Sequence, residues 1–531
     1  MTHPILRSAL SAAFALLAAA PLAAQRAPRG PTAAAIERAA STITAADFLQ
    51  RLGVIADDSM RGRETPSPEL DQTAAYIAAE FARLGLRPGG DNGTFLQRYP
   101  IRRTQVDTGG FVMVMGRGTM GHWVLGRDVA LLEGALPEST ITGPAVLMVG
   151  LPTDPARPFG DVDVRGAVVF QALPLSAQMQ QDRMLATIAA GAAAGARTWV
   201  LLLNLPPQMI ARMAGGALGP QYKVPGLGGL LPLPLLLLRD SSAAEVLRAA
   251  GDELAAIRDT SVHTIHALPG FTATVSARQR LLSETSAPNV VGILEGSDPL
   301  LRNEYVVVTG HMDHVGVSAG GRCTAAGADS ICNGADDDGS GTIGVIELAR
   351  AFAALTPRPR RSLVFVTVSG EERGLWGSEW YVAHPVQPLA QHVADLNLDM
   401  ISRNWRDSLN WRDSIAVLGK EMSTLGEVAN RMTRDHPEHR MRLVDDPEHN
   451  RYFMQSDHYS FATHGVPVLF FFTQTHPDLH RPTDDLSRTD ADKAARVLKM
   501  VFYVALDVAN AAQRPVWDAA ARQRVVREGQ P

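Results

Sequence analysis

Hydrophobic and polar positions change their period several times along the 531-residue chain. Over residues 71–84, apolar side chains recur every three or four positions, which predicts an amphipathic helix that ends at Gly85. The wider stretch 45–86 is predicted to be helical. Further on, short apolar runs alternate with alanine-rich stretches, which predicts strands at 145–149, 167–171, 198–203 and 233–238, with a helix at 184–196.

From residue 289 onward, apolar runs typical of buried strands alternate with helical patterns. Alternating strands and helices predict an α/β fold: a mixed, largely parallel central sheet flanked by helices. The strand candidates are 289–294, 305–309, 362–368, 394–398 and 466–472, and the helix candidates are 342–355 and 490–509.

The N-terminus has the pattern of a signal peptide. Arg7 precedes an apolar, alanine-rich run over 8–20, and the sequence up to Ala24 fits a cleavage site. We therefore expect export to the periplasm or the medium. A second apolar stretch, 224–238, is too short and too interrupted by proline to span a membrane.

Changes in residue composition along the rest of the chain indicate where its domains begin and end. The segment 126–267 holds few residues that could perform chemistry, and we interpret it as an inserted β-rich α+β domain. The predicted order is a signal peptide (1–24), a linker (25–41), the N-terminal part of the main domain (42–125), the insertion (126–267), the catalytic domain (268–513) and a frayed tail (514–531).

The amino-acid composition excludes several classes of protein function. Hydrophobic residues make up 46% and charged residues 20%, so the chain can bury a core. The formal charge of −5 argues against a nucleic-acid binder that relies on bulk positive charge. Two cysteines exclude a disulfide-dense scaffold and a four-cysteine zinc site, whereas 15 histidines leave a histidine and carboxylate metal site open.

Residues able to bind metal or move protons follow the predicted strands. Ligands of an open α/β sheet bind beyond the carboxyl ends of its strands, so these side chains should converge. Each motif alone is commonly a solvated loop or a helix cap, but here all fall at strand ends. Imidazoles and carboxylates together suit zinc, or manganese or cobalt. The residues are His311, Asp313, His314, Asp336, Asp337, Asp338, Glu371, Glu372, Asp399 and His480.

Five motifs in this order resemble peptidase family M28, a family of zinc metallopeptidases, and in particular its exported bacterial aminopeptidases. They lie at 305–314, 333–341, 369–378, 397–400 and 479–484. Residues 163–170 within the insertion resemble a strand of a protease-associated (PA) domain.

The resemblance implies two Zn²⁺ ions per chain. Asp337 would bridge them, with His311 and Asp399 completing one ion's ligands and Glu372 and His480 the other's.

It further implies that Glu371 is the general base and that Asp313 accepts the free ring N–H of His311.

The implied activity is that of an aminopeptidase acting on peptides. A carboxypeptidase or dipeptidase on the same metal site would need a cation for the substrate carboxylate, for which Arg403, Arg406 and Arg481 are candidates. A glutaminyl cyclase or a non-catalytic binding protein fits less well. We expect no nucleic-acid partner and no stable membrane insertion after signal cleavage, and the sequence leaves the oligomeric state open.

Several residues near the motifs have other expected roles. In an exported protein, Cys323 and Cys332 are expected to pair. Asp457 and His458 are expected in a buried hydrogen-bonded network rather than as further ligands. Tyr452 or Tyr459 is either a structural tyrosine or a donor near the oxyanion. The repeated Asn-Trp-Arg-Asp-Ser segment over 404–414 fits a solvated loop or a rim over a cleft.

Overall fold

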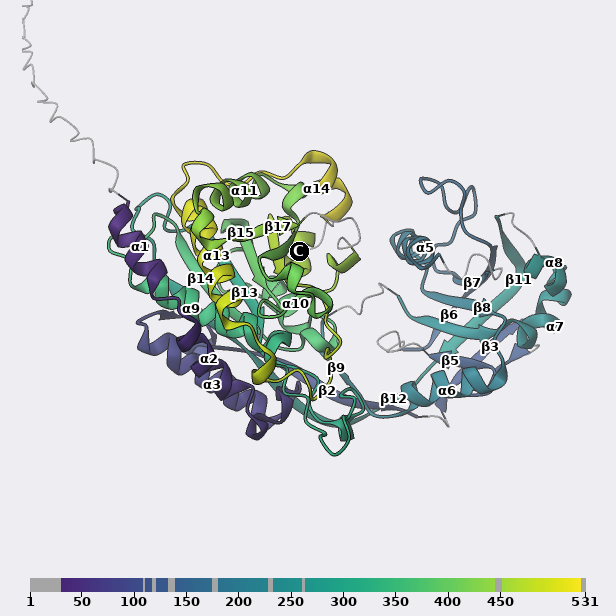
Figure 1. The fold of residues 1–531 in the computed structure, drawn as a ribbon. Helices are drawn as coiled ribbons and strands as arrows, with labels where there is room; N and C mark the ends of the chain where they lie inside the picture. Colours follow the sequence, from purple (N-terminus) through teal and green to yellow (C-terminus); the bar gives the residue numbers. More distant parts are fainter. Residues whose placement is uncertain are drawn as a thin grey trace, which may run out of the picture.

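The computed structural model describes residues 30–107, 110–116, 121–131, 139–173, 180–227, 233–259, 263–444 and 451–526. The predicted signal peptide lies outside these residues. The ribbon forms two lobes joined by long strands (Figure 1). None of the helices described there has the length and apolar character that crossing a bilayer requires.

The larger lobe is built on a ten-stranded mixed sheet. Four neighbouring central strands are parallel, and antiparallel strands extend the sheet on both sides. This agrees with the predicted mixed, largely parallel sheet. The order is β17 (Arg442–Val444), β16 (Ser414–Leu418), β18 (Val468–Phe472), β15 (His392–Leu398), β13 (Tyr305–His311), β14 (Ser362–Val368), β12 (Gln279–Leu294), β2 (Leu96–Val106) and β9 (Gln221–Lys223), with β1 (Arg87–Pro88) paired to β12.

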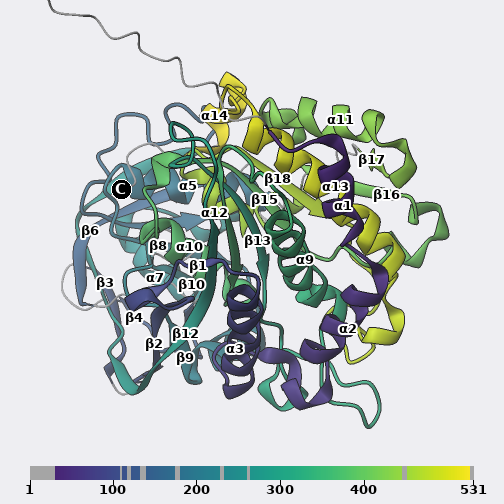
Figure 2. The same ribbon diagram turned by 90° about the vertical axis from the view of Figure 1, so that its left-hand side faces the viewer.

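Successive residues of the central strands supply two different cores. In β13, Val306 and Val308 pack on one face, whereas Val307 packs on the other. The first face is covered by α2 (Ala45–Ile55), α3 (Pro68–Arg83), α9 (Gly341–Ala353), α11 (Leu425–Asp435) and α13 (Ala491–Asn510) (Figure 2). The second is covered by α10 (Trp376–Ala383) and α12 (His458–Thr463). Both faces of the parallel strands are thus buried, which explains their continuous apolar runs.

The N-terminal helices begin at side-chain caps. Thr32, Thr44 and Ser67 each accept a backbone N–H of the first turn of α1 (Ala33–Ser41), α2 and α3. The predicted linker 25–41 is therefore wrong over its second half. Ala39 and Ala40 of α1 pack into the main core, so burial stabilises a short alanine-rich helix that its composition alone did not indicate.

The smaller lobe contains an eight-stranded sheet whose four central strands, β6, β7, β8 and β10, are parallel. Its strands are β4 (Gly121–His122), β3 (Val112–Gly116), β11 (Thr264–Ser276), β6 (Ile141–Val149), β7 (Val168–Ala172), β8 (Thr198–Leu203), β10 (Leu235–Arg239) and β5 (Val129–Leu131), and its helices are α5 (Gln181–Ala193), α6 (Pro207–Leu218), α7 (Asp240–Ala250) and α8 (Leu254–Asp259).

The predicted limits of the insertion, 126–267, are too narrow. Strand β3 lies before residue 126 and β11 continues past residue 267, yet both belong to the sheet of the smaller lobe. The long antiparallel ladder of β2 and β12 leads from one lobe to the other without a break in strand pattern. Strand β9, from inside the insertion, returns to pair with β2 in the main sheet.

The C-terminal segment is more ordered than the predicted frayed tail. Residues 519–525 form α14 (Ala519–Val525), and the Trp517 indole N–H donates to the Gly465 carbonyl at 2.8 Å. Near the main sheet, Cys323 and Cys332 form the expected disulfide.

Candidate functional site

The ends of four parallel strands bring the predicted side chains together. His311 is the last residue of β13, Glu371 and Glu372 lie in the turn after β14, and Asp399 follows β15 directly. His480 comes from the loop after β18. All lie at one edge of one sheet, where an α/β fold binds its ligands.

Asp337 lies at the centre of the group, in the turn that precedes α9. One of its oxygens, Oδ1, is 3.4 Å from His311 Nε2. The other, Oδ2, is 3.2 Å from His480 Nε2. The two oxygens of one carboxylate therefore face two different sets of ligand atoms.

The first set contains His311 and Asp399. The Nε2 atom of His311 is 3.6 Å from Asp399 Oδ1. The Ser456 hydroxyl donates to the other oxygen, Oδ2, at 2.8 Å, which leaves Oδ1 directed at the imidazole. Asp338 is also close, but its carboxylate accepts the backbone N–H groups of His311, Gly341 and Met400.

The second set contains Glu372, His480 and a residue that the sequence left unassigned, His314. Glu372 Oε1 is 3.1 Å from His480 Nε2 and 3.1 Å from His314 Nδ1. His314 Nδ1 is also 3.5 Å from Asp337 Oδ2. The signal was present as the second histidine of His-Met-Asp-His at 311–314.

Gly334 allows His314 to approach Asp337. It adopts φ +58°, and an added Cβ would lie 2.4 Å from His314 Cγ and 2.3 Å from the Asp337 carbonyl oxygen. Only glycine fits both the backbone conformation and this space.

Asp313 differs from its expected role. The ring atom Nδ1 of His311 is 3.1 Å from the backbone carbonyl of Asp313, whereas the Asp313 carboxylate lies 3.7 Å away. The carboxylate instead accepts the Thr65 hydroxyl at 2.9 Å and the backbone N–H of Glu371 at 3.3 Å. Asp313 therefore fixes the His311 ring through its main chain and the position of Glu371 through its side chain.

Glu371 lies beside the metal-ligand atoms without being enclosed by them. Its Oε2 atom is 4.0 Å from His311 Nε2. Burial, and then the nearby Glu372 and Asp399 carboxylates, raise the pKa of Glu371 well above its usual range despite His311. The side chain can thus take up a proton more readily than an exposed glutamate.

The carboxylates of Asp337 and Glu372 stay ionised because positive charge lies next to them. Burial would raise the pKa of Asp337, but His314, His311 and His480 hold it well below its usual range. The pKa of Glu372 is about 2, because His314 and His480 outweigh burial and the Asp337 charge. The same two carboxylates raise the pKa of His480 to about 10 against burial. Cations at this site would take over the role of the protonated imidazoles.

Several of these atoms have unused bonding capacity. Within the described part of the chain, His314 Nδ1 and Nε2, Glu372 Oε1 and Asp399 Oδ1 are buried without a hydrogen-bond partner. Buried polar atoms normally have partners, whereas here His314 Nδ1 faces Glu372 Oε1 at 3.1 Å and Asp399 Oδ1 faces His311 Nε2 at 3.6 Å. Nitrogen and carboxylate ligands in two adjacent sets fit divalent cations of the zinc class.

Residues further out hold the ligand-bearing loops. Asp484 accepts the backbone N–H groups of Asp336 and Asp337, each at 3.1 Å. Arg63 is fully buried, and its guanidinium donates to four carbonyls at 2.6–2.9 Å, those of Ile55, Met312, Asn333 and Gly334. It therefore joins the loop after β13 to the turn that carries Asp337.

The other candidates lie outside the two ligand sets. Asp457 and His458 are fully buried, Asp457 next to the Ser378 side chain and His458 next to the Phe453 backbone. Tyr452 packs edge-on against Phe472 and accepts from Arg451 at 2.8 Å.

The arginines considered for a substrate carboxylate differ in accessibility. Arg403 is buried and paired with Asp407 and Asp478 at 2.6 and 2.8 Å. Arg406 lies over the Trp405 ring, and Arg481 is exposed.

Comparison with known proteins finds a matching family model and several similar proteins. Residues 289–505 match the model of peptidase family M28. A probable zinc metalloprotease of Pyricularia oryzae is 32% identical over 288 residues, which is 46% of this chain and 54% of the relative. Aminopeptidase YwaD of Bacillus subtilis is 28% identical over 127 residues, which is 24% of each chain. The chain thus spans about half the length of the first of these relatives, and a quarter of the second.

Two solved structures are also similar. An aminopeptidase from Aneurinibacillus sp. strain AM-1 has a TM-score of 0.49 at 17% identity, covering 91% of this chain and 98% of the other. The zinc aminopeptidase BSAP from Bacillus subtilis has a TM-score of 0.44 at 16% identity, covering 87% and 94%.

We predict that Arg63→Met lowers the free energy of unfolding by about 3–5 kcal/mol, because four buried carbonyls lose their donor. Urea denaturation measures this change. The exposed Arg102, paired with Glu284, provides the control: Arg102→Met should shift it by no more than about 0.5–1 kcal/mol. Equal effects of both substitutions would contradict the role given to Arg63.

Proposed function

We propose that the protein is a two-zinc aminopeptidase that hydrolyses the N-terminal bond of peptides, since residues 289–505 match the model of peptidase family M28. The observation that carries the proposal is the Asp337 carboxylate, whose two oxygens face His311 on one side and His480 on the other. A carboxylate in this position is suited to bridging two metal ions.

His311, Asp337 and Asp399 would hold one ion. Asp337, Glu372 and His480 would hold the other, and the position of His314 supports it as an additional ligand. The second ion would then have four protein ligands and the first only three. A three-ligand ion leaves a position for substrate or water, as catalytic zinc sites do.

When bound, the ions would polarise the scissile carbonyl and lower the pKa of water at the site. Glu371 would take the proton of the attacking water and deliver it to the leaving amine. Its position beside His311 and its raised pKa support this role. The Asp313 carboxylate would hold the Glu371 backbone while this proton moves.

The choice of an aminopeptidase rests on the similarity to aminopeptidase YwaD of Bacillus subtilis and on the arginines near the site. A carboxypeptidase needs a cation to receive the substrate carboxylate, and Arg403 is already paired with two aspartates.

We also propose that the protein is exported and that residues 1–24 are a cleaved signal peptide. The disulfide between Cys323 and Cys332 supports an oxidising compartment. The smaller lobe is proposed to be a PA-type insertion, on the resemblance of residues 163–170.

A peptide panel with free, acetylated and amidated ends tests the activity. We expect release of the first residue from peptides with a free N-terminus, whatever the state of the C-terminus, and loss of this activity with a chelator. Liquid chromatography of the products measures both. Cleavage of acetylated peptides but not of free-amine peptides would refute the aminopeptidase assignment.

Glu371→Gln tests the general base. The amide keeps the size of the side chain but accepts no proton, so turnover should fall by about 10²–10⁴-fold while zinc content stays the same. Steady-state kinetics and elemental analysis measure the two effects. Glu284→Gln, at an exposed glutamate, is the control. Normal turnover of Glu371→Gln would disprove the role of Glu371.

His314→Ala tests the additional ligand. Removing one of four ligands should weaken the affinity for the ion held by Asp337, Glu372 and His480 by at least about 10-fold. Competition with a zinc indicator measures this affinity without reference to catalysis. The exposed His384 gives a matched control, His384→Ala, which should bind zinc as the wild type does. Unchanged zinc affinity of His314→Ala would restrict His314 to a packing role.

A further inference from the structure

Another group of metal-ligand side chains lies between the motifs at 397–400 and 479–484, where α11 ends. His436 caps the helix, and Glu438 and His439 follow in a short turn, Pro437–His439. His436 Nδ1 is 3.0 Å from Glu438 Oε1, and His439 Nε2 is 3.6 Å from the same oxygen. All three ligand atoms lie within 4.8 Å of one another.

These separations fit a tetrahedral cation. With metal–ligand bonds near 2.0–2.1 Å, neighbouring ligand atoms of a zinc site are about 3.3 Å apart. The two distances at Glu438 Oε1 fall on either side of this value. Small rotations of exposed side chains would equalise them, since the Glu438 side chain is 54% exposed.

The two imidazoles are held in place before any ion binds. The His436 ring stacks on Tyr503 of α13 at a centroid distance of 3.5 Å, and the His439 ring lies nearly parallel to it. The Tyr503 hydroxyl donates in turn to Glu37 of α1 at 2.9 Å. Ligands that are already oriented lose little conformational entropy on binding.

The environment favours a bound cation. His439 Nε2 is buried and has no hydrogen-bond partner among the residues that the structure describes. The carbonyl end of α11 also carries partial negative charge.

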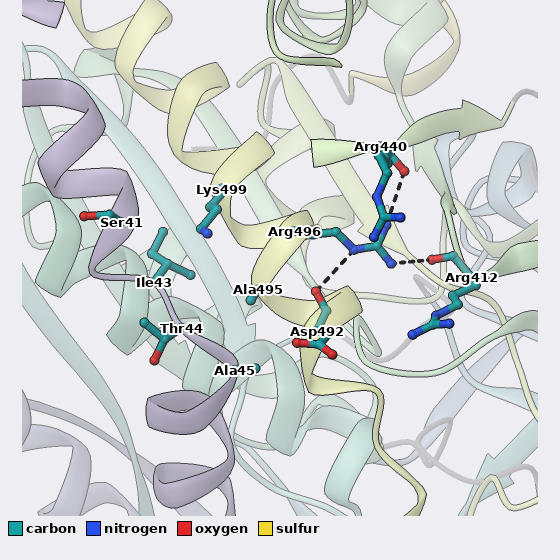
Figure 3. A pocket seen from close by; sticks show the side chains of 10 residues that line it. All are labelled: Ser41, Ile43, Thr44, Ala45, Arg412, Arg440, Asp492, Ala495, Arg496 and Lys499. Atoms are coloured by element: carbon teal, nitrogen blue, oxygen red, sulfur yellow. Dashed lines mark hydrogen bonds between the residues drawn. The ribbon is translucent and has the colours of Figure 1, made fainter. Parts of the chain in front are cut away.

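Positive side chains lie in a neighbouring hollow. Lys499 and Arg440 line a cavity of about 510 Å³ between α1 and α13, together with Arg412 and Arg496 (Figure 3). Arg496 donates there to the backbone carbonyls of Arg412 and Arg440. At His439, Glu438 and Glu37 favour a cation, whereas Lys499 and His436 oppose it.

We propose that His436, Glu438 and His439 form a peripheral Zn²⁺ site, with water in the fourth position, that ties the end of α11 to α13 and α1. Its donor set, two imidazoles and one carboxylate, is one that zinc commonly takes. The site is separate from the ligands of the proposed catalytic centre.

Zinc stoichiometry tests the proposal. The full-length protein is stripped with a chelator, reloaded with ZnCl₂, desalted and analysed for zinc per chain. Glu438→Gln and His439→Ala should each retain one Zn²⁺ fewer per chain than the wild type. This difference does not depend on how many ions the catalytic centre holds, and peptide hydrolysis should change by less than about twofold.

The exposed His122 of the smaller lobe gives the control variant, His122→Ala, which should retain as much zinc as the wild type. Added ZnCl₂ should also raise the melting temperature of the wild type at least about 2 °C more than that of Glu438→Gln, since an ion at this site stabilises only the folded chain. Equal zinc content in the wild type and both site variants would overturn the proposal, as would a loss of zinc only in His122→Ala.

Discussion

Buried negative charge at one edge of the main sheet is the constraint on which the rest of this structure depends. Asp337, Glu371, Glu372 and Asp399 share a volume from which water is largely excluded. Ionised carboxylates in such a place cost free energy unless positive charge compensates them. The His311 and His480 imidazoles, whose pKa values are raised, compensate part of this charge, and divalent cations would compensate it more completely.

Residues outside the two ligand sets hold the loops that carry the ligands, through hydrogen bonds to the main chain of those loops. Asp338 and Asp484 accept backbone N–H groups, and Arg63 donates to backbone carbonyls, so the loops keep their shape. None of these three residues needs to touch a substrate. Their role is to hold carboxylates that would otherwise repel one another beside the imidazoles that contact them.

Much of the larger lobe could be predicted from the sequence, because its parallel strands are buried on both faces and give unbroken apolar runs. The strand 362–368 agrees at both ends, and 466–472 begins two residues late because Pro467 lacks an N–H for the ladder. The insertion limits could not be predicted, because β2 and β12 run between the lobes without a turn signal.

The ligand residues could be located in the sequence because they follow strands. The direction of each side chain within its loop could not be predicted in this way. His314 lies three residues after His311, and only Gly334 and the fold of the turn bring it to Glu372. In the same way, no spacing distinguishes the main-chain carbonyl of Asp313 from its carboxylate as the partner of His311.

The two proposed metal sites differ in the number of negatively charged ligands that they offer. The central site offers several buried carboxylates, whereas the site at His436 offers one, on a side chain that is half exposed. Cation affinity rises with the number of anionic ligands and falls with access to water, because water screens the interaction. The central site therefore has the charge needed to hold ions throughout a reaction cycle. The site at His436 has two imidazoles that are already oriented and a single carboxylate, which favour reversible binding that adds to the stability of the contact between α11, α13 and α1.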